Sequence, residues 1–292
     1  MTALSKQTQT RVTLHAAQIE DDSGVRRAIE ASRPDECYHL AAQSFAGADS
    51  ERERETLSTN IVGTHNVLAA LVHGAPDCRL FFAGSSEQFG DPEESPQSER
   101  TPFQPRSVYG ISKTAGYGLV RHYRERRGLR ASCGLLFNHE SPRRGPAFVT
   151  RKISLGVARI AAGKARELIL GGLDARRDWG WAPEYVQAMW LMLQQPEPDD
   201  YVIATGETHS VREFAERAFA AAGLDYQQYV RIDGSLQRPP ETVERVGDAR
   251  KARDRLGWRA RKPFAEIVRE MVASDCELEG VESAAAARMR EG

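Results

Sequence analysis

Short apolar runs alternate with amphipathic stretches along most of this chain. Five runs have the length and apolar character of buried strands: residues 11–17, 37–42, 80–83, 131–137 and 201–205. Other stretches repeat apolar positions at helical spacing: residues 23–32, 51–73, 148–162, 185–195 and 264–272. Because strand and helix alternate, the pattern predicts an α/β fold whose strands are joined by right-handed crossovers into a parallel sheet.

A tyrosine and a lysine lie four residues apart in a predicted helix that opens near Ser107. This spacing places Tyr109 and Lys113 on one helix face. A phenol has an ordinary pKa near ~10, and a neighbouring ammonium group favours the phenolate. We therefore expect Lys113 to lower the pKa of Tyr109, so that Tyr109 can act as a general base.

Polar residues follow two of the predicted strands. The strand at 80–83 is followed by Ser85 and Glu87, and the strand at 131–137 is followed by Asn138. Ligands of doubly wound sheets bind beyond the carboxyl ends of the parallel strands. The sequence thus predicts that one sheet edge gathers five side chains: Ser85, Glu87, Tyr109, Lys113 and Asn138.

Several short motifs resemble those of the GDP-mannose 4,6-dehydratase family, within the extended short-chain dehydrogenase/reductase superfamily. The similar segments are Ser85-Ser86-Glu87, Pro105-Arg106-Ser107 leading into Tyr-x-x-x-Lys, residues 138–145, residues 148–152, Arg177-Asp178-Trp179-Gly180, and Arg238-Pro239. The resemblance extends from about residue 14 to residue 275. It implies dehydration of GDP-mannose to GDP-4-keto-6-deoxymannose by an internal redox reaction that uses NADP.

The resemblance also implies roles for individual residues. Tyr109 would be the base at the sugar 4-hydroxyl, Lys113 would hold the cofactor ribose, Ser85 would hydrogen-bond O4, and Glu87 would move the C5 proton to the departing 6-hydroxyl. The implied cofactor contacts are Gln18, Ile19, Leu40, Ala41, Ala42, Gln43, Ser44, Lys113, His139 and Arg144. The implied contacts to the nucleotide sugar are Asn138, Lys152, Arg177, Arg238 and Glu241.

The printed sequence contains no glycine-rich turn of the Gly-x-Gly-x-x-Gly type, and its first glycine is Gly24. By comparison with the family, we expect the chain to lack the N-terminal strand-helix-strand unit, a loss of about 30 residues. That turn and the following helix N-terminus normally bind the pyrophosphate, so weak NADP binding is expected.

These patterns predict an incomplete Rossmann-type doubly wound parallel sheet with a smaller C-terminal substrate-binding domain. Residues 1–145 would form a truncated dinucleotide-binding domain that carries the catalytic residues. Residues 146–275 would bind the nucleotide sugar, with about 176–206 returning to the first domain, and residues 276–292 would form a tail. Residues 91–105, rich in proline and acids, are expected to form a surface loop over the site.

Composition narrows the class of protein. The formal net charge of −1 argues against a general nucleic-acid or membrane-surface binder. No apolar run approaches the ~18 residues of a membrane span, and residues 1–10 lack a signal peptide's apolar segment. The four cysteines are scattered without metal-type pairing, so we expect no metal site and reduced thiols in a cytoplasmic protein.

Two other readings stay open from the sequence. The chain could be a non-catalytic or cofactor-deficient nucleotide-sugar-binding relative, or a dehydratase or epimerase that acts on another nucleotide sugar. The four catalytic candidates favour an enzyme, whereas the lack of the glycine-rich turn favours the non-catalytic reading. The resemblance further implies a homo-oligomer, either a dimer or a tetramer.

Overall fold

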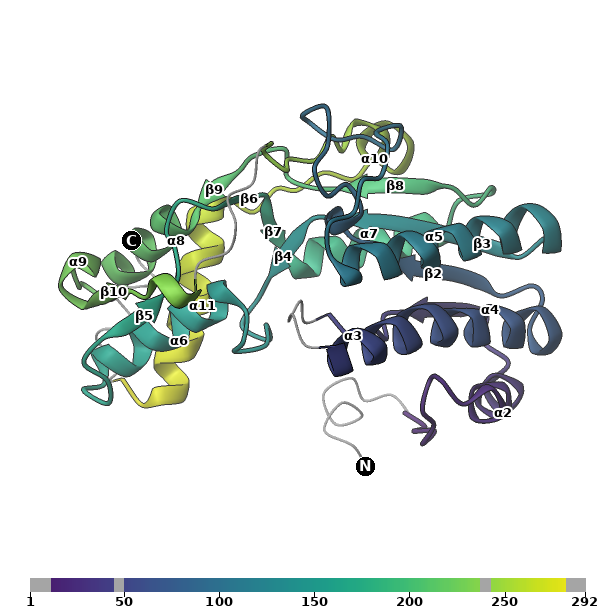
Figure 1. The fold of residues 1–292 in the computed structure, drawn as a ribbon, viewed down its shortest axis with the longest axis horizontal. Coiled ribbons are helices and arrows are strands. Elements are labelled where there is room, and N and C mark those ends of the chain that lie inside the picture. Colours follow the sequence, from purple (N-terminus) through teal and green to yellow (C-terminus); the bar gives the residue numbers. More distant parts are fainter. Residues whose placement is uncertain (1–11, 45–49, 237–242, 282–292) are drawn as a thin grey trace.

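The computed structural model describes residues 12–44, 50–236 and 243–281. Two lobes lie side by side, a larger one built around a parallel sheet and a smaller one built mainly of helices (Figure 1). The sheet has four parallel strands in the order β1-β2-β3-β8, which are Glu36–His39, Arg79–Ala83, Arg130–Leu136 and Asp200–Ile203. The predicted α/β class with a doubly wound parallel sheet is confirmed.

Alternate side chains of the central strands bury against two helical layers, as the pleat of a strand requires. Leu80 and Phe82 of β2 pack with α2 (Asp22–Ser32), α4 (Gly63–Gly74) and α5 (Val108–Arg127). Phe81 lies in a second cluster with α7 (Ala182–Leu193) and α10 (Arg250–Leu256). Strands buried on both faces read as nearly continuous apolar runs, which is why the pattern predicted them.

The helix predicted at 51–73 forms, but it contains a π-helical turn. It consists of α3 (Ser50–Leu57), the π segment η1 (Ser58–Val62) and α4. Residues 12–17, which we predicted as a strand, pair with no strand of the described chain and are mostly exposed. The strand predicted at 37–42 ends at His39, and residues 40–44 continue as an irregular loop.

Three helices form the smaller lobe. They are α6 (Val149–Ala161), α8 (Val211–Ala221) and α11 (Phe264–Glu279), which bury a shared apolar core. A capping box begins α8, with Ser210 and Glu213 satisfying each other's backbone N–H groups. The helix α11 does not end at the predicted start of the tail, because Cys276 is fully buried in this core.

Shorter elements complete the smaller lobe and the junction between the lobes. The strand pairs are β4 (Asn138–Glu140) with β7 (Trp179–Trp181), β5 (Leu168–Leu170) with β10 (Val230–Ile232), and β6 (Arg176–Arg177) with β9 (His209–Ser210). The short helical turns are η2 (Ser86–Gln88), α9 (Tyr226–Tyr229) and η3 (Gly234–Leu236).

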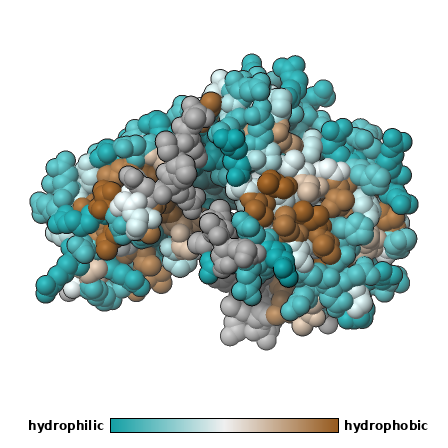
Figure 2. Space-filling model, in the orientation of Figure 1, coloured by the Kyte–Doolittle hydropathy of each residue, from teal (hydrophilic) through white to brown (hydrophobic). Residues whose placement is uncertain are grey.

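The predicted division into residues 1–145, 146–275 and 276–292 stays a prediction. Within the second part, β8 is a strand of the larger lobe's sheet and α7 packs on that sheet. This is the behaviour expected of residues 176–206. The helix α10 packs there as well, a return that the sequence did not suggest. Figure 2 shows polar side chains over much of the visible face, with apolar side chains gathered on the larger lobe.

A buried carboxylate ties α5 to the sheet. Arg124 donates to both oxygens of Asp200 at 2.8 Å, and Tyr117 donates its hydroxyl hydrogen to the same group at 3.0 Å. The backbone N–H of Cys133 lies 3.2 Å from it. Removing the charge from such a group leaves the buried guanidinium without its counter-ion, which is strongly destabilising.

We expect Asp200→Asn to lower the free energy of unfolding by about 3 kcal/mol. Urea denaturation followed by circular dichroism would measure it. The matched control is Glu125→Gln, whose ion pair with Arg121 is half exposed on both sides and should be worth less than about 1 kcal/mol. Equal losses in the two variants would contradict the role given to Asp200.

Candidate active site

The turn after β2 fixes the positions of Ser85 and Glu87. Ser85 is the N-cap of η2: its hydroxyl oxygen accepts from the backbone N–H of Glu87 at 3.2 Å, and its own N–H donates to Gln88 Oε1 at 2.8 Å. A side chain at Gly84 would lie 2.7 Å from Gln88 Oε1 and 2.9 Å from Cys133 Sγ. Only glycine therefore lets the strand turn so tightly into the site.

Tyr109 lies in the first turn of α5, where Ser107 is the N-cap and accepts from the backbone N–H of Gly110 at 3.0 Å. Burial raises the pKa of Tyr109, a side-chain hydrogen bond with Ser85 lowers it, and the charge of Glu87 raises it; the net shift is upward. Ser85 and Glu87 thus both act on Tyr109 at this edge of the sheet, and their catalytic roles stay a prediction.

Lys113 does not act on Tyr109 as we expected. Its ammonium group donates to the carbonyl oxygen of Ala83 at 2.8 Å and lies 5.9 Å from the centre of the Tyr109 ring. Burial lowers the pKa of Lys113 to about 8. The expectation that Lys113 lowers the pKa of Tyr109 is wrong for this structure, because the cost of burying the phenolate exceeds any stabilisation by the ammonium group.

His39, the last residue of β1, lies beside Lys113. The His39 side chain is buried, and its Nε2 lies 2.9 Å from Thr64 Oγ1. Burial and the charge of Lys113 lower the pKa of His39 to about 4, so this imidazole is neutral at pH 7. A neutral ring is consistent with a buried site that already holds one cation.

The loop after β1 is held by the π-helical turn. Asn60 of η1 accepts from the backbone N–H of Gln43 at 2.8 Å and donates to its carbonyl oxygen at 3.0 Å. The same amide donates to the hydroxyl of Ser112 in α5 at 2.9 Å. One buried side chain thereby places residues 40–44 beside the helix that carries Tyr109 and Lys113.

Gln18 and Ile19, the other predicted cofactor contacts from the first residues, form a turn against the same long helix. Gln18 is exposed, whereas the carbonyl oxygen of Ile19 accepts from Asn66 at 3.1 Å. A side chain at Gly63, three residues after Asn60, would lie 2.7 Å from Ile19. Gln18 and Ile19 therefore contact the long helix about one helical turn after Asn60, which holds the 40–44 loop.

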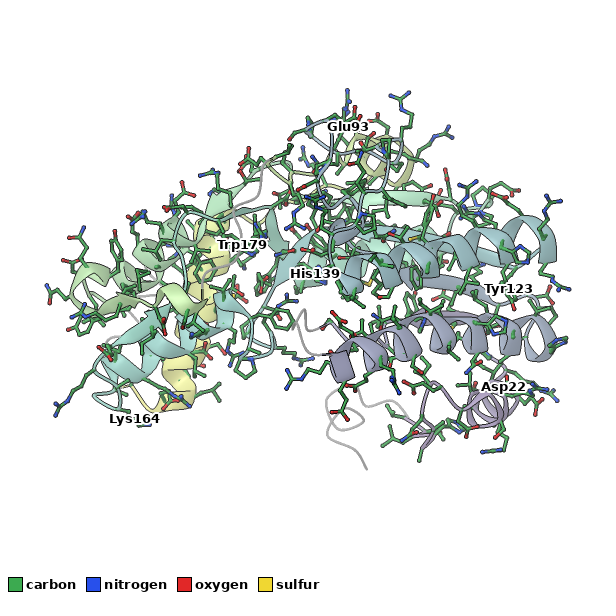
Figure 3. The ribbon with its side chains drawn as sticks, viewed as in Figure 1. Asp22, Glu93, Tyr123, His139, Lys164 and Trp179 are labelled. Atoms are coloured by element: carbon green, nitrogen blue, oxygen red, sulfur yellow. The ribbon has the colours of Figure 1, made fainter. Side chains whose placement is uncertain are left out.

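The chain that follows β3 brings Asn138 and His139 to the junction of the two lobes, where Figure 3 labels His139. His139 Nδ1 lies 2.9 Å from the carbonyl oxygen of Phe137, and its ring stacks on Tyr185 with centroids 4.7 Å apart. Burial lowers the pKa of His139 to about 4. The ring is therefore a neutral, oriented group.

Arg144 completes this side of the site. Its guanidinium stacks over Phe148, 3.6 Å from the ring centre, and its Nε lies 3.4 Å from Glu140 Oε2. Burial raises the pKa of Glu140 to about 7, against the opposing effects of Arg144 and of the Thr150 hydroxyl. The positive charge of Arg144 lowers the pKa of Tyr109, so Arg144 acts on the same group as Ser85 and Glu87.

The predicted substrate contacts other than Asn138 belong to the smaller lobe or fall outside the described residues. Lys152 lies on α6, where its charge lowers the pKa of Asp233, and Arg177 lies in β6. Arg238 and Glu241 lie outside the residues that the structure describes.

Three residues described at the site were missed from the sequence: His39, Asn60 and Arg245. Arg245 lies 2.6 Å from the carboxylate of Glu87 and is almost completely buried. A polar residue within the apolar face of a predicted helix could have drawn attention to Asn60. Nothing around Arg245 in the sequence signals its partner, which is 158 residues away.

This arrangement suits proton transfer beside a phosphate-bearing cofactor. A phenol, a hydroxyl and a carboxylate lie together for acid-base work, while Lys113 and Arg144 supply positive charge at the carboxyl ends of the strands. Within residues 12–44, 50–236 and 243–281, no group of three or more His, Cys, Asp or Glu side chains could hold a metal ion.

Comparison with known proteins gives one family. The family model described as GDP-mannose 4,6 dehydratase matches residues 1–271. GDP-mannose 4,6 dehydratase 2 of Arabidopsis thaliana is 47% identical over 269 residues, covering 91% of this chain and 72% of that protein. GDP-mannose 4,6 dehydratase of Homo sapiens is 43% identical over 284 residues, covering 91% and 76%.

Solved structures share the fold at lower identity. RMD from Pseudomonas aeruginosa, complexed with NADPH, superposes with a TM-score of 0.84 at 23% identity, covering 92% of this chain and 90% of that one. The dTDP-glucose 4,6-dehydratase of Bacillus anthracis, in complex with NAD, gives 0.81 at 17% identity, covering 97% and 86%.

The low pKa of His39 makes stability depend on pH. Because the unfolded chain binds a proton near pH 6.5 and the folded chain only near pH 4, the unfolding free energy is highest above pH 6.5. The contribution of His39 to this free energy falls by roughly 3 kcal/mol as the pH drops from 6.5 to about 4. We expect His39→Gln to flatten this fall, measured by urea denaturation at pH 7, 5.5 and 4.

The matched control is His122→Gln on the exposed face of α5, which should leave the pH dependence as it is in the unchanged protein. A slope that His39→Gln does not alter would contradict the neutral, buried state given to His39.

Proposed function

Because this chain belongs to the GDP-mannose 4,6-dehydratase family, we propose that it catalyses the NADP-dependent internal redox dehydration of GDP-mannose to GDP-4-keto-6-deoxymannose. The observation that carries the proposal is the contact of Ser85, Glu87 and Tyr109 at the carboxyl end of β2, beside the buried Lys113. This reaction removes the proton of the 4-hydroxyl and the proton of C5, and the cluster supplies a group for each removal. The proton lost from the 4-hydroxyl balances the one that C5 regains when the hydride returns to C6.

We assign to Tyr109 the removal of the proton of the sugar 4-hydroxyl as C4 is oxidised, which requires its phenolate form. Because burial raises the pKa of Tyr109, the positive charge of Arg144 and of a bound oxidised nicotinamide would have to favour that form. Ser85, which already bonds to the Tyr109 phenol, holds the same oxygen and keeps the hydroxyl aligned with its base. Proximity of this kind lowers the barrier mainly by fixing the reacting groups in advance. Lys113, fixed on the Ala83 carbonyl, remains the cationic neighbour that faces the cofactor ribose.

Glu87 performs the second proton transfer. A ketone at C4 acidifies the neighbouring C5–H bond, so a carboxylate can remove that proton. Glu87 then returns it to the departing 6-hydroxyl, which leaves as water. The carboxylate is about one third exposed, so it can reach a ligand lying over the turn.

Apart from the glycine-rich pyrophosphate turn, which the printed sequence does not contain, the residues present fit NADP as the cofactor. Lys113 and Arg144 offer positive charge, the 40–44 loop offers backbone groups fixed by Asn60, and the ring of His139 is neutral and oriented. When bound, NADP supplies the hydride acceptor at C4 and the hydride donor at C6. We assign Gln18, Ile19, residues 40–44, Lys113, His139 and Arg144 to its site.

GDP-mannose is the proposed substrate, with its nucleotide lying toward the smaller lobe. Asn138, Lys152 and Arg177 are the described residues that we assign to it, together with Arg238 and Glu241. Guanidinium and ammonium groups suit the diphosphate, because they donate charge-assisted hydrogen bonds to its oxygens.

A homo-oligomer and a cytoplasmic location are part of the proposal. The four cysteines are free and three of them are buried, as expected of a protein in a reducing compartment. No helix among the described residues is long and apolar enough to cross a membrane.

The reaction itself tests the proposal. Incubated with GDP-mannose and NADP, the full chain should form GDP-4-keto-6-deoxymannose, followed by mass spectrometry. Tyr109→Phe should lower kcat by a factor of about 10² to 10⁴. Glu87→Gln should stop product formation but still allow oxidation at C4, seen as nicotinamide absorbance in a single turnover.

Glu93→Gln is the control for Glu87→Gln, because Glu93 is an exposed acid on the neighbouring loop (Figure 3). Normal dehydration by Glu87→Gln would remove Glu87 from the mechanism. Turnover of UDP- or dTDP-sugars in place of GDP-mannose would support the alternative of another nucleotide-sugar enzyme, and binding without turnover would support the non-catalytic one.

Binding of the nucleotide is a separate expectation. GDP at 100 times its Kd should stabilise the protein by about 2.7 kcal/mol, which corresponds to a rise in Tm of roughly 5 to 10 °C. Lys152→Ala should reduce this rise. Lys164→Ala, at the far end of the smaller lobe (Figure 3), should keep it. A rise that Lys152→Ala leaves intact would contradict the substrate assignment.

A further inference from the structure

The segment that follows residue 242 is fixed along one side by the acidic loop 91–105. The backbone N–H of Gln97 donates to the carbonyl oxygen of Val246 at 2.8 Å, and the N–H of Asp248 donates to the carbonyl oxygen of Gln97 at 2.8 Å. The fully buried side chain of Gln97 accepts from the N–H of Val246 at 3.0 Å. The loop predicted to lie over the site is therefore joined to residues 244–248.

A buried carboxylate fixes the same segment on its other side. Asp178 accepts from the backbone N–H of Gly247 at 3.3 Å and from that of Gly206 at 3.0 Å. A side chain at Gly247 would lie 2.3 Å from the Cβ of Ala204. These contacts hold the backbone around Arg245 without using its side chain.

The side chain of Arg245 is directed at Glu87. Its Nη1 lies 2.6 Å from Glu87 Oε1, and the Arg245 side chain is only 8% exposed whereas that of Glu87 is 38% exposed. A guanidinium held away from water costs free energy unless a carboxylate compensates for it. Charge-assisted bonds of this length are also strong and directional.

We propose that Arg245 is a positioning residue for the reaction: it keeps the Glu87 carboxylate aimed at the place where the sugar binds. This inference rests on the proposed function, in which Glu87 removes the C5 proton. Among the described charged and titratable groups, Arg245 from the 243–249 segment and Tyr109 from α5 act on Glu87. Arg144 lowers the pKa of Tyr109, whereas Glu87 raises it.

The Arg245–Glu87 ion pair is not needed to hold either backbone in place. Because Gln97 and Asp178 already fix the segment, the Arg245–Glu87 bond is not needed to hold the 91–105 loop in place. Glu87 is likewise fixed by the cap of η2. The ion pair thus joins two backbones that are each held independently, and its effect falls on the orientation of the carboxylate.

Three variants of the full chain test the proposal. Arg245→Leu removes the positive charge, and Arg245→Lys restores the charge without the planar guanidinium. Arg106→Leu is the control, because it removes an exposed arginine that pairs with Asp91 at 2.8 Å. We expect Arg245→Leu to lower kcat for GDP-mannose by about 100-fold with little change in KM. Arg245→Lys should recover at least about tenfold, and Arg106→Leu should behave as the unchanged chain.

A second measurement does not require turnover. With glutamate labelled by ¹³C at Cδ, the Glu87 signal is assigned by its loss in Glu87→Gln and is followed by NMR. We expect Arg245→Leu to move this signal, because the carboxylate loses a charge-assisted hydrogen bond. Arg106→Leu should leave the signal in place.

The outcomes separate the two proposals. If the unchanged chain does not dehydrate GDP-mannose, the proposed function fails, and the Glu87 signal alone decides whether Arg245 orients this carboxylate. A Glu87 signal that Arg245→Leu leaves unchanged would overturn the inference. So would a rise in KM at constant kcat, which would make Arg245 a substrate contact instead.

Discussion

Parallel pairing of β1, β2 and β3 is the constraint on which the site depends. His39 lies opposite Phe82, and Phe82 lies opposite Cys133, so β1 and β2 end at nearly the same level, while β3 continues beyond it to Leu136. The chain leaves each strand within a few residues of that level. Ser85, the 40–44 loop and Asn138 can therefore meet only at this edge, and α5 adds Tyr109 and Lys113 because it packs directly on the sheet.

Burial, rather than the pairing of charges, sets the electrostatics of this edge. It lowers the pKa values of His39 and Lys113 and raises that of Tyr109. Each shift disfavours a charged form, as expected where water is largely excluded. A cation and a neutral imidazole are thus held side by side, and ligands that bring their own charge would alter these equilibria.

The sequence predicted the parts of the fold that depend on local pattern. Continuous apolar runs identified the buried strands, and the four-residue spacing identified Tyr109 and Lys113 as neighbours. It failed at residues 12–17, whose strand-like composition finds no pairing partner among the described strands. It also failed for the direction of the Tyr109 pKa, because burial is a property of the whole packing. Arg245 was out of reach, since its partner lies 158 residues away. Asn60 could have been noticed as a polar residue on an apolar helix face, but its partner Ser112 could not.

The π turn at Ser58–Val62 has a consequence for how this scaffold tolerates change. A π turn accommodates one residue more than a regular helix needs, so deleting one residue there would let α3 and α4 join as a single regular helix. The apolar face of α4 against α2 and the sheet would then keep its register. Asn60 would lose its position between Gln43 and Ser112. A single deletion here would thus leave the protein able to fold but would disturb the geometry of the site.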